Sequence, residues 1–263
     1  MTEVAIDDSR IRTSRGEVFA RRWSPKSAAG APIVLLHDSL GCVALWRDFP
    51  EALARSLGRG VIAYDRPGYG ESTPHEGRQQ PSFIDDEPGQ AFAAVLDHFG
   101  IGDFVVLGHS VGGGMAAAVA AAFPERCLGL VTEAAQAYVE ERTRQGIREA
   151  EQGFADPEQM ARLARYHGEK ADWVLRAWVD TWHSKAFDHW SLDDTLVRVS
   201  CPVLAMHGDQ DEFGSAGQPE RIASLSAGPA EIRILPACGH VPHREQPDVV
   251  LSEVARFLDR IGA

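Results

Sequence analysis

The chain contains 263 residues, and its 26 Lys and Arg against 38 Asp and Glu give a formal net charge of −12 at pH 7. Hydrophobic residues make up 44% and charged residues 24%, which is typical of a globular domain and excludes a disordered or collagen-like chain. The acidic balance argues against a nucleic-acid or anionic-membrane surface, since either would need a basic patch. The longest apolar runs, 33–36 and 115–123, are far shorter than the ~20 residues of a membrane-spanning helix.

The N-terminus and the cysteines indicate the cellular setting. The first residues lack the basic start and apolar run of a secretory signal. The cysteines form no CxxC pair and no metal-ligand rhythm; they are Cys42, Cys127, Cys201 and Cys238. We therefore expect a cytoplasmic protein with reduced thiols and with neither a metal nor a cofactor. Its expected partner is a small-molecule substrate rather than a nucleic acid or a membrane, and a homodimer is left open.

Strand and helix patterns alternate along most of the chain. Residues 10–13 and 17–23 predict a hairpin, and the apolar run at 32–37 predicts a strand buried on both faces of a parallel sheet. The other predicted strands are 61–64, 104–107, 127–132, 202–206 and 231–235, and the predicted helices are 49–57, 90–99, 113–123, 219–225 and 247–261. This alternation predicts an α/β fold with a mostly parallel central sheet and helices on both faces.

Residues 136–197 break the alternation. They show three successive helical patterns, at 140–151, 157–167 and 171–183, and they hold four of the six tryptophans. The segment follows the sixth predicted strand, so it must emerge at the carboxyl edge of the sheet, where open α/β sheets place their ligand sites. We therefore expect a helical lid (cap) on a core made of 1–135 and 198–263. An ordinary helical insertion with its own aromatic core is the alternative.

The strongest local signal is Gly108-His109-Ser110-Val111-Gly112, a G-x-S-x-G pattern. It directly follows a predicted strand and opens a helix rich in small residues, which is the context that this motif requires. The two glycines allow a sharp turn that exposes the Ser110 hydroxyl at a helix N-terminus, where backbone N–H groups stabilise negative charge. Ser110 is therefore the predicted nucleophile.

A serine nucleophile needs a base and a residue that orients the base. His240 lies on the loop after the predicted strand 231–235, which is where the chain order Ser-Asp-His places the base. His243 lies nearer to the last helix and is the alternative base. After the preceding strand, Asp211 has cleared the strand-end turn, whereas Asp209, the alternative acid, is still in its tight part. We therefore predict His240 as the base and Asp211 as the acid that orients it.

The developing oxyanion needs two backbone donors. The N–H of Val111 follows the nucleophile, and the N–H of Ser39 belongs to the loop 37–41 after an early strand, with the Asp38 amide as the alternative. The candidate substrate-binding residues are Asp38, His109, Glu133, Trp178 and Trp182. For Glu133, a hydrogen bond at the base of the lid is the alternative role.

Taken in order, these motifs resemble those of the α/β-hydrolase superfamily. The resemblance covers nearly the whole chain, through the loop 37–41, the turn Asp65-Arg66-Pro67-Gly68-Tyr69-Gly70-Glu71-Ser72, the Ser110 turn, 208–211 and 239–240. Within the superfamily the chain is similar to bacterial carboxylesterase-like hydrolases and to the biphenyl-hydrolase-like (valacyclovir hydrolase) group.

The chain departs from relatives of that kind in three respects. Val111 stands where amine-recognising members carry an acid, which disfavours amino-acid esters. Residues 38–40 differ from the Gly-Pro-Gly loop of meta-cleavage C–C hydrolases, and many relatives have Gly where Asp38 stands. A serine at the nucleophile turn also disfavours a dehalogenase, which carries Asp there.

The resemblance and the motifs together predict a serine hydrolase. Its expected substrate is a small to medium carboxylic ester, lactone or thioester with an apolar or aromatic group, because aromatic lid residues exclude water and supply contact area. A C–C bond hydrolase or lyase that uses the same triad and a ligand receptor with slow turnover are the alternatives.

Overall fold

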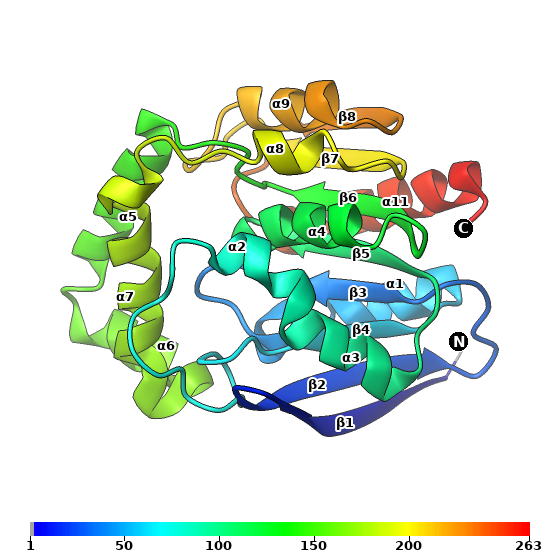
Figure 1. Ribbon diagram of the computed structural model, residues 1–263, viewed down its shortest axis with the longest axis horizontal. Helices are drawn as coiled ribbons and strands as arrows, with labels where there is room; N and C mark the ends of the chain where they lie inside the picture. The colour runs from blue at the N-terminus through cyan, green and yellow to red at the C-terminus, as the bar shows by residue number, and fades with distance from the viewer. Residues whose placement is uncertain (1–2) are drawn as a thin grey trace.

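An eight-stranded sheet forms the centre of the computed structural model, which describes residues 3–263 (Figure 1). In spatial order its strands are β1 (Val4–Thr13), β2 (Gly16–Pro25), β4 (Val61–Tyr64), β3 (Ile33–Leu36), β5 (Phe104–His109), β6 (Cys127–Glu133), β7 (Val203–Gly208) and β8 (Ala230–Leu235). Strand β2 pairs antiparallel with β1 and β4, and all the other neighbours pair parallel. The expected α/β fold with a mostly parallel sheet is confirmed.

Helices cover both faces of the sheet because its inner strands are apolar on both. In β3, Val34 and Leu36 pack into the core on one face, and Ile33 and Leu35 pack into the core on the other. The helices on the first face are α2 (Phe83–Asp86), α3 (Ala91–Phe99), α4 (Val111–Ala122), α8 (Asp193–Leu196) and α9 (Gly217–Leu225). The helices on the second face are α1 (Phe49–Leu57) and α11 (Pro247–Ile261). The short helix α10 (Pro242–Glu245) directly precedes α11. The short 3-10 helices are η1 (Val43–Trp46), η2 (Glu87–Gly89), η3 (Gly168–Lys170) and η4 (Lys185–Phe187).

Some elements differ from those expected. The hairpin is longer than predicted, since β1 starts at Val4 and β2 runs on to Pro25, and the added residues of β1 are largely exposed and show no alternation of buried and exposed positions. Cross-strand ion pairs accompany this extension, including one between Arg21 and Asp8. The four-residue helices α2, α8 and α10 were not predicted, because a single helical turn is too short to show a helical period.

Three helices stand apart from the sheet, beyond the carboxyl ends of the strands (Figure 1). They are α5 (Glu141–Gly153), α6 (Pro157–His167) and α7 (Ala171–Trp182). Part of the aromatic content of the segment 136–197 packs on itself, as the rings of Trp182, Phe187 and Trp190 do. Helix α8, which falls inside the segment 136–197, instead packs on α4 against the sheet. The segment thus returns to the core before residue 198.

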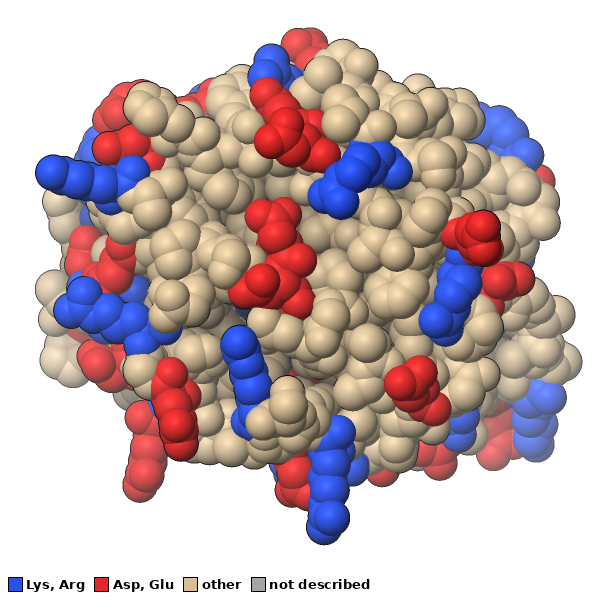
Figure 2. All heavy atoms as spheres, in the orientation of Figure 1, with Lys and Arg blue, Asp and Glu red and all other residues tan. Residues whose placement is uncertain are grey.

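The face of the molecule that Figure 2 shows carries charges of both signs. Among the described residues on the face shown, acidic and basic side chains are interspersed (Figure 2). Within residues 3–263, none of the helices combines the length and the apolar character needed to cross a bilayer.

Candidate active site

Ser110 sits in a strained turn between β5 and α4. Its φ is +56° and its ψ −126°, a conformation that a residue with a side chain rarely adopts. A Cβ at Gly108 would overlap the Gly112 carbonyl, and a Cβ at Gly112 would overlap the carbonyl of Leu36 on the neighbouring strand, so both positions require glycine. The Ser110 N–H donates to the Glu133 carbonyl at 2.8 Å, which fastens the turn to β6. The turn therefore presents the Ser110 hydroxyl at the first turn of α4.

The structure places a histidine and a carboxylate in line with this hydroxyl. The Ser110 Oγ lies 3.0 Å from His240 Nε2, and His240 Nδ1 lies 2.9 Å from both carboxylate oxygens of Asp211. A carboxylate only accepts, so Nδ1 carries the imidazole proton and Nε2 is left free to accept the serine proton. Asp211 is fully buried, and its Oδ1 also accepts from the Phe213 N–H at 2.7 Å. This is the arrangement through which a histidine removes the proton of a serine.

The same contacts shift both pKa values. Burial alone would lower the pKa of His240, but the hydrogen bond and charge of Asp211 outweigh burial and raise it above its ordinary value of 6.5. The carboxylates of Glu212 and Asp38 add to this increase. Burial would raise the pKa of Asp211, but its contacts with His240 and with His207 hold the pKa below its ordinary value. At neutral pH Asp211 therefore stays ionised.

Backbone contacts explain why Asp211, not Asp209, faces the histidine. The Asp209 N–H donates to the Leu235 carbonyl at the end of β8, and the Asp209 side chain is exposed. Two residues later the chain has turned inward and buries Asp211. The loop that carries His240 is held in turn by Glu245, which accepts from the N–H groups of Gly239 at 2.7 Å and Val241 at 2.9 Å.

The loop after β3 supplies the expected second donor. The Asp38 carbonyl accepts from His37 Nδ1 at 2.8 Å, from Arg66 Nη2 at 2.7 Å and from the Gly41 N–H at 3.3 Å. Because the C=O and N–H of a trans peptide point in opposite directions, these donors turn the Ser39 N–H away from them. Within residues 3–263 the N–H groups of Ser39 and Val111 donate to no protein acceptor. Both are free to bind an oxyanion.

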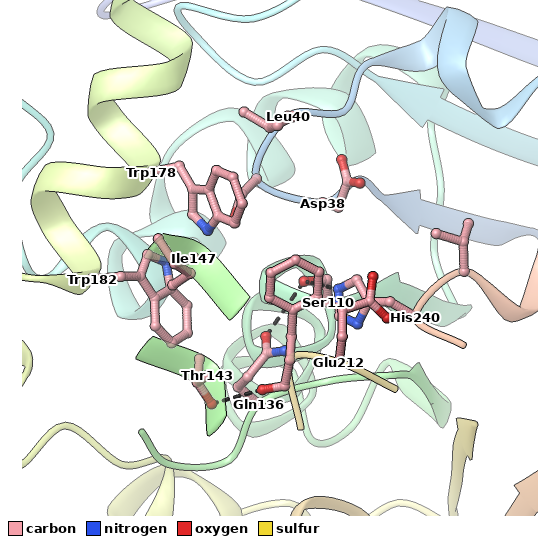
Figure 3. A pocket seen from close by; sticks show the side chains of 13 residues that line it. Asp38, Leu40, Ser110, Gln136, Thr143, Ile147, Trp178, Trp182, Glu212 and His240 are labelled. Atoms are coloured by element: carbon pink, nitrogen blue, oxygen red, sulfur yellow. Dashed lines mark hydrogen bonds between the residues drawn. The ribbon is translucent and has the colours of Figure 1, made fainter. Parts of the chain in front are cut away.

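A cavity of about 200 Å³ opens above the Ser110 hydroxyl. Trp178 and Trp182 project from α7 on the side opposite Ser110 and His240, as Figure 3 shows. The remaining lining residues come from the loop after β3, from α5 and from the loops after β6, β7 and β8; they are Asp38, Ser39, Leu40, Gln136, Thr143, Ile147, Glu212, Phe213 and Val241. The cavity is thus bounded by aromatic and aliphatic groups of α5 and α7 on one side and by Ser110 and His240 on the other.

Two candidate substrate-binding residues lie elsewhere. His109 and Glu133 are absent from the cavity lining and are buried beneath it. His109 Nε2 donates to the His240 carbonyl at 2.7 Å, and the Glu133 Oε2 accepts from His243 Nδ1 at 2.7 Å. His109 is the last residue of β5 and Glu133 is the last residue of β6. Both side chains point toward a helix layer and away from the cavity. Their side chains thus bond to the loop of His240 and to α10 instead of lining the cavity, and the buried His243 bonds to Glu133 while His240 lies beside Ser110.

Several lining residues carried no motif in the sequence. The Gln136 Oε1 lies 3.4 Å from the Ser110 Oγ, and Gln136 stands three residues beyond the end of β6. The Phe213 ring packs on His240 with centroids 4.6 Å apart. The sequence could have pointed to these two residues only through their positions after β6 and β7, because the loops at the carboxyl edge of a parallel sheet converge on one site. Within the described chain, no group of three metal-ligating side chains is brought together.

Most of the chain matches one known protein family. Residues 31–247 match the profile of a family described as the alpha/beta hydrolase fold. That range takes in the loop of Ser39, the Ser110 turn, Asp211 and His240. The resemblance expected from the motifs is therefore confirmed.

Individual relatives differ in their chemistry. The dihydrolipoyllysine-residue acetyltransferase component of the acetoin cleaving system of Pseudomonas putida is 30% identical over 93% of this chain and 68% of its own length. The structure of 2-hydroxy-6-oxo-6-phenylhexa-2,4-dienoate hydrolase from Rhodococcus sp. strain RHA1 covers 98% of this chain and 100% of its own, with a TM-score of 0.79 and 19% identity. The carboxylesterase CesB of Bacillus subtilis covers 97% and 92%, with a TM-score of 0.70 and 22% identity. At these identities the two structures show a shared fold.

Proposed function

The protein belongs to the alpha/beta hydrolase fold family, and on that basis we propose that it is a serine hydrolase which cleaves a small to medium carboxylic ester through an acyl-enzyme. The observation that carries the proposal is the unbroken hydrogen-bond line from the Ser110 hydroxyl through His240 to the buried Asp211. The two free amides of Ser39 and Val111 beside it support the same chemistry.

In the first half of the reaction, Ser110 Oγ attacks the ester carbonyl carbon while its proton passes to His240 Nε2. Asp211 stabilises the resulting imidazolium through its hydrogen bond to Nδ1. The carbonyl oxygen becomes an oxyanion that accepts from the Ser39 and Val111 N–H groups, the latter at the positive end of α4. The ester C–O bond then breaks, and the imidazolium gives its proton to the leaving alkoxide.

In the second half, a water molecule adds to the acyl group on Ser110. His240 takes one proton of that water, and the same two amides bind the second oxyanion. The bond between the acyl carbon and Ser110 Oγ breaks, the proton returns to the serine, and a carboxylic acid leaves. His240, Asp211 and the two amides act in both halves of the reaction. The resting enzyme is therefore restored with no reactant other than the ester and water.

The cavity supports a modest, largely apolar substrate. Its volume of about 200 Å³ is below the roughly 300–1,000 Å³ of pockets for drug-sized ligands. Trp178, Trp182, Ile147 and Phe213 line it with apolar surface. An aromatic or short aliphatic group fits this lining, and lactones and thioesters of the same size would use the same steps.

The test is hydrolysis of p-nitrophenyl esters from acetate to octanoate by the purified protein. We expect kcat/KM to be highest for short acyl chains and to fall at octanoate, since the cavity limits the length that can be buried. Absence of hydrolysis across the series, together with turnover of a vinylogous diketone, would replace the proposal by C–C bond cleavage on the same triad.

The pH dependence tests the role of His240. Its imidazole must be neutral to accept the proton of Ser110, and its pKa is raised above the ordinary value of 6.5. We therefore expect kcat/KM for p-nitrophenyl butyrate to rise with pH along one acid limb with its midpoint above 6.5. A rate that is flat between pH 5.5 and 8.5 would remove His240 from the role of base.

A further inference from the structure

A histidine of the lid makes direct contact with the loop that carries the Ser39 amide. His167, the last residue of α6, is buried, and its Nε2 lies 2.9 Å from the Leu40 carbonyl oxygen. Its Nδ1 lies 2.9 Å from the Gly70 N–H, which donates to it. A backbone carbonyl only accepts and a backbone N–H only donates, so Nε2 carries the proton and His167 is neutral. Burial lowers the pKa of His167, which favours the same neutral form.

This contact continues as a chain of hydrogen bonds to the oxyanion donor. The Leu40 carbonyl that accepts from His167 shares its peptide unit with the Gly41 N–H. That N–H donates to the Asp38 carbonyl at 3.3 Å, and the Asp38 carbonyl shares its peptide unit with the Ser39 N–H. Because each peptide is planar, the orientation of one end sets that of the other. Hydrogen bonds in such a chain also polarise one another.

The core holds the carbonyl end of only one of these two peptide units. His37 and Arg66 donate to the Asp38 carbonyl from the core side. Within the described residues, the Leu40 carbonyl has His167 as its only hydrogen-bond donor. If α6 moved away, the peptide between Leu40 and Gly41 would keep only the 3.3 Å hydrogen bond from its N–H to the Asp38 carbonyl and would lose the contact that fixes its carbonyl end.

We propose that His167 is a positioning residue which aligns the Ser39 amide through the peptide units of Leu40–Gly41 and Asp38–Ser39, so that the oxyanion site is complete only while the lid is docked. The inference rests on the proposed role of Ser39 as an oxyanion donor. It links closure of the lid to the chemical step rather than to substrate affinity.

The test compares His167→Phe with Lys170→Met. The phenyl ring keeps the approximate shape of the imidazole and removes both hydrogen bonds. Lys170 anchors the neighbouring turn of the lid to the carbonyls of Gly70 at 2.6 Å and Ser72 at 2.7 Å, without a contact to the loop 38–41. It is thus a matched control for loss of a lid anchor alone.

For His167→Phe we expect kcat for p-nitrophenyl butyrate to fall about 10- to 100-fold with KM within about twofold, because a misplaced donor weakens only the transition state. Lys170→Met should keep kcat within about threefold of the wild type, since exposed and half-buried anchors contribute little. His167→Gln, whose amide can both donate and accept, should recover part of the loss. A kcat for His167→Phe equal to that of Lys170→Met, or a loss expressed only in KM, would overturn the proposal.

A second measurement does not depend on catalysis. Exchange of the Gly41 amide hydrogen, followed by NMR, should become about tenfold faster in His167→Phe, since one hydrogen bond of ordinary strength is worth about that factor. It should be unchanged in Lys170→Met. Unchanged Gly41 exchange in His167→Phe would refute the chain of contacts. If the wild type hydrolysed no ester, the proposed function would fail while Gly41 exchange would still decide whether His167 holds the loop.

Discussion

Replacing Ser110 by alanine is expected to lower kcat for p-nitrophenyl butyrate by about 10⁴- to 10⁶-fold, because the Ser110 hydroxyl is the one that lies within hydrogen-bond distance of His240 Nε2. The hydroxyl is the only part of the side chain that is lost. The Ser110 N–H, which fastens the turn to the Glu133 carbonyl, is retained, and alanine meets the same strain at φ +56° as serine does. The melting temperature should therefore stay close to that of the wild type.

The measurement combines steady-state rates with mass spectrometry of protein treated with a fluorophosphonate. Wild-type protein should gain one phosphonyl adduct on Ser110, and Ser110→Ala should gain none. Ser56→Ala is the matched control, because the Ser56 hydroxyl donates only to the Leu53 carbonyl of its own helix, at 3.2 Å. Retention of more than about a hundredth of the wild-type kcat by Ser110→Ala would show that another nucleophile acts.

Replacing Asp211 by asparagine is expected to lower kcat by about 10³- to 10⁴-fold, although the side chain keeps its shape. Asparagine can donate to Nδ1, which would move the imidazole proton to Nε2 and prevent His240 from accepting the serine proton. It also removes the carboxylate whose hydrogen bond and charge raise the pKa of His240 against burial. The acid limb of the pH profile should therefore move to lower pH in Asp211→Asn.

Asp209→Asn provides the comparison, two residues away in the same loop. The Asp209 side chain is exposed, so its loss of charge should change kcat less than about threefold. Full pH profiles of kcat/KM for both variants decide the assignment. A larger loss in Asp209→Asn than in Asp211→Asn would transfer the orienting role to Asp209.

Most of the architecture could be predicted from local patterns. The strand pattern at 104–107 is continuously apolar because β5 lies at the centre of the sheet with helices on both faces, and the helical period at 247–261 reproduces α11. The start of β1 and the end of β2 could not be predicted in this way. β1 is an edge strand whose first residues pair with the end of β2, so pairing and ion pairs, rather than burial, hold this part of the backbone extended.

The candidate site, too, could be predicted only in part from local patterns. Ser110 could be identified because a sharp strand-to-helix turn requires glycine two residues before it and two residues after it. This requirement involves only five consecutive residues, so the sequence shows it directly. The side chains of His109 and Glu133 could not be assigned from position alone. Their burial below the cavity depends on contacts with the distant His240 and His243.

By itself the sequence determined the order of strands and helices, the nucleophile turn and the loops from which the base and acid would come, because each depends on burial and backbone geometry within a short stretch. The packed structure was needed to show that His109 and Glu133 are buried below the cavity, that Gln136 and Phe213 line it, and that His167 reaches the Leu40 carbonyl across 127 residues of chain. These contacts join elements that are remote in sequence. They are set by how the lid and the strand ends pack together, and no local pattern encodes that packing.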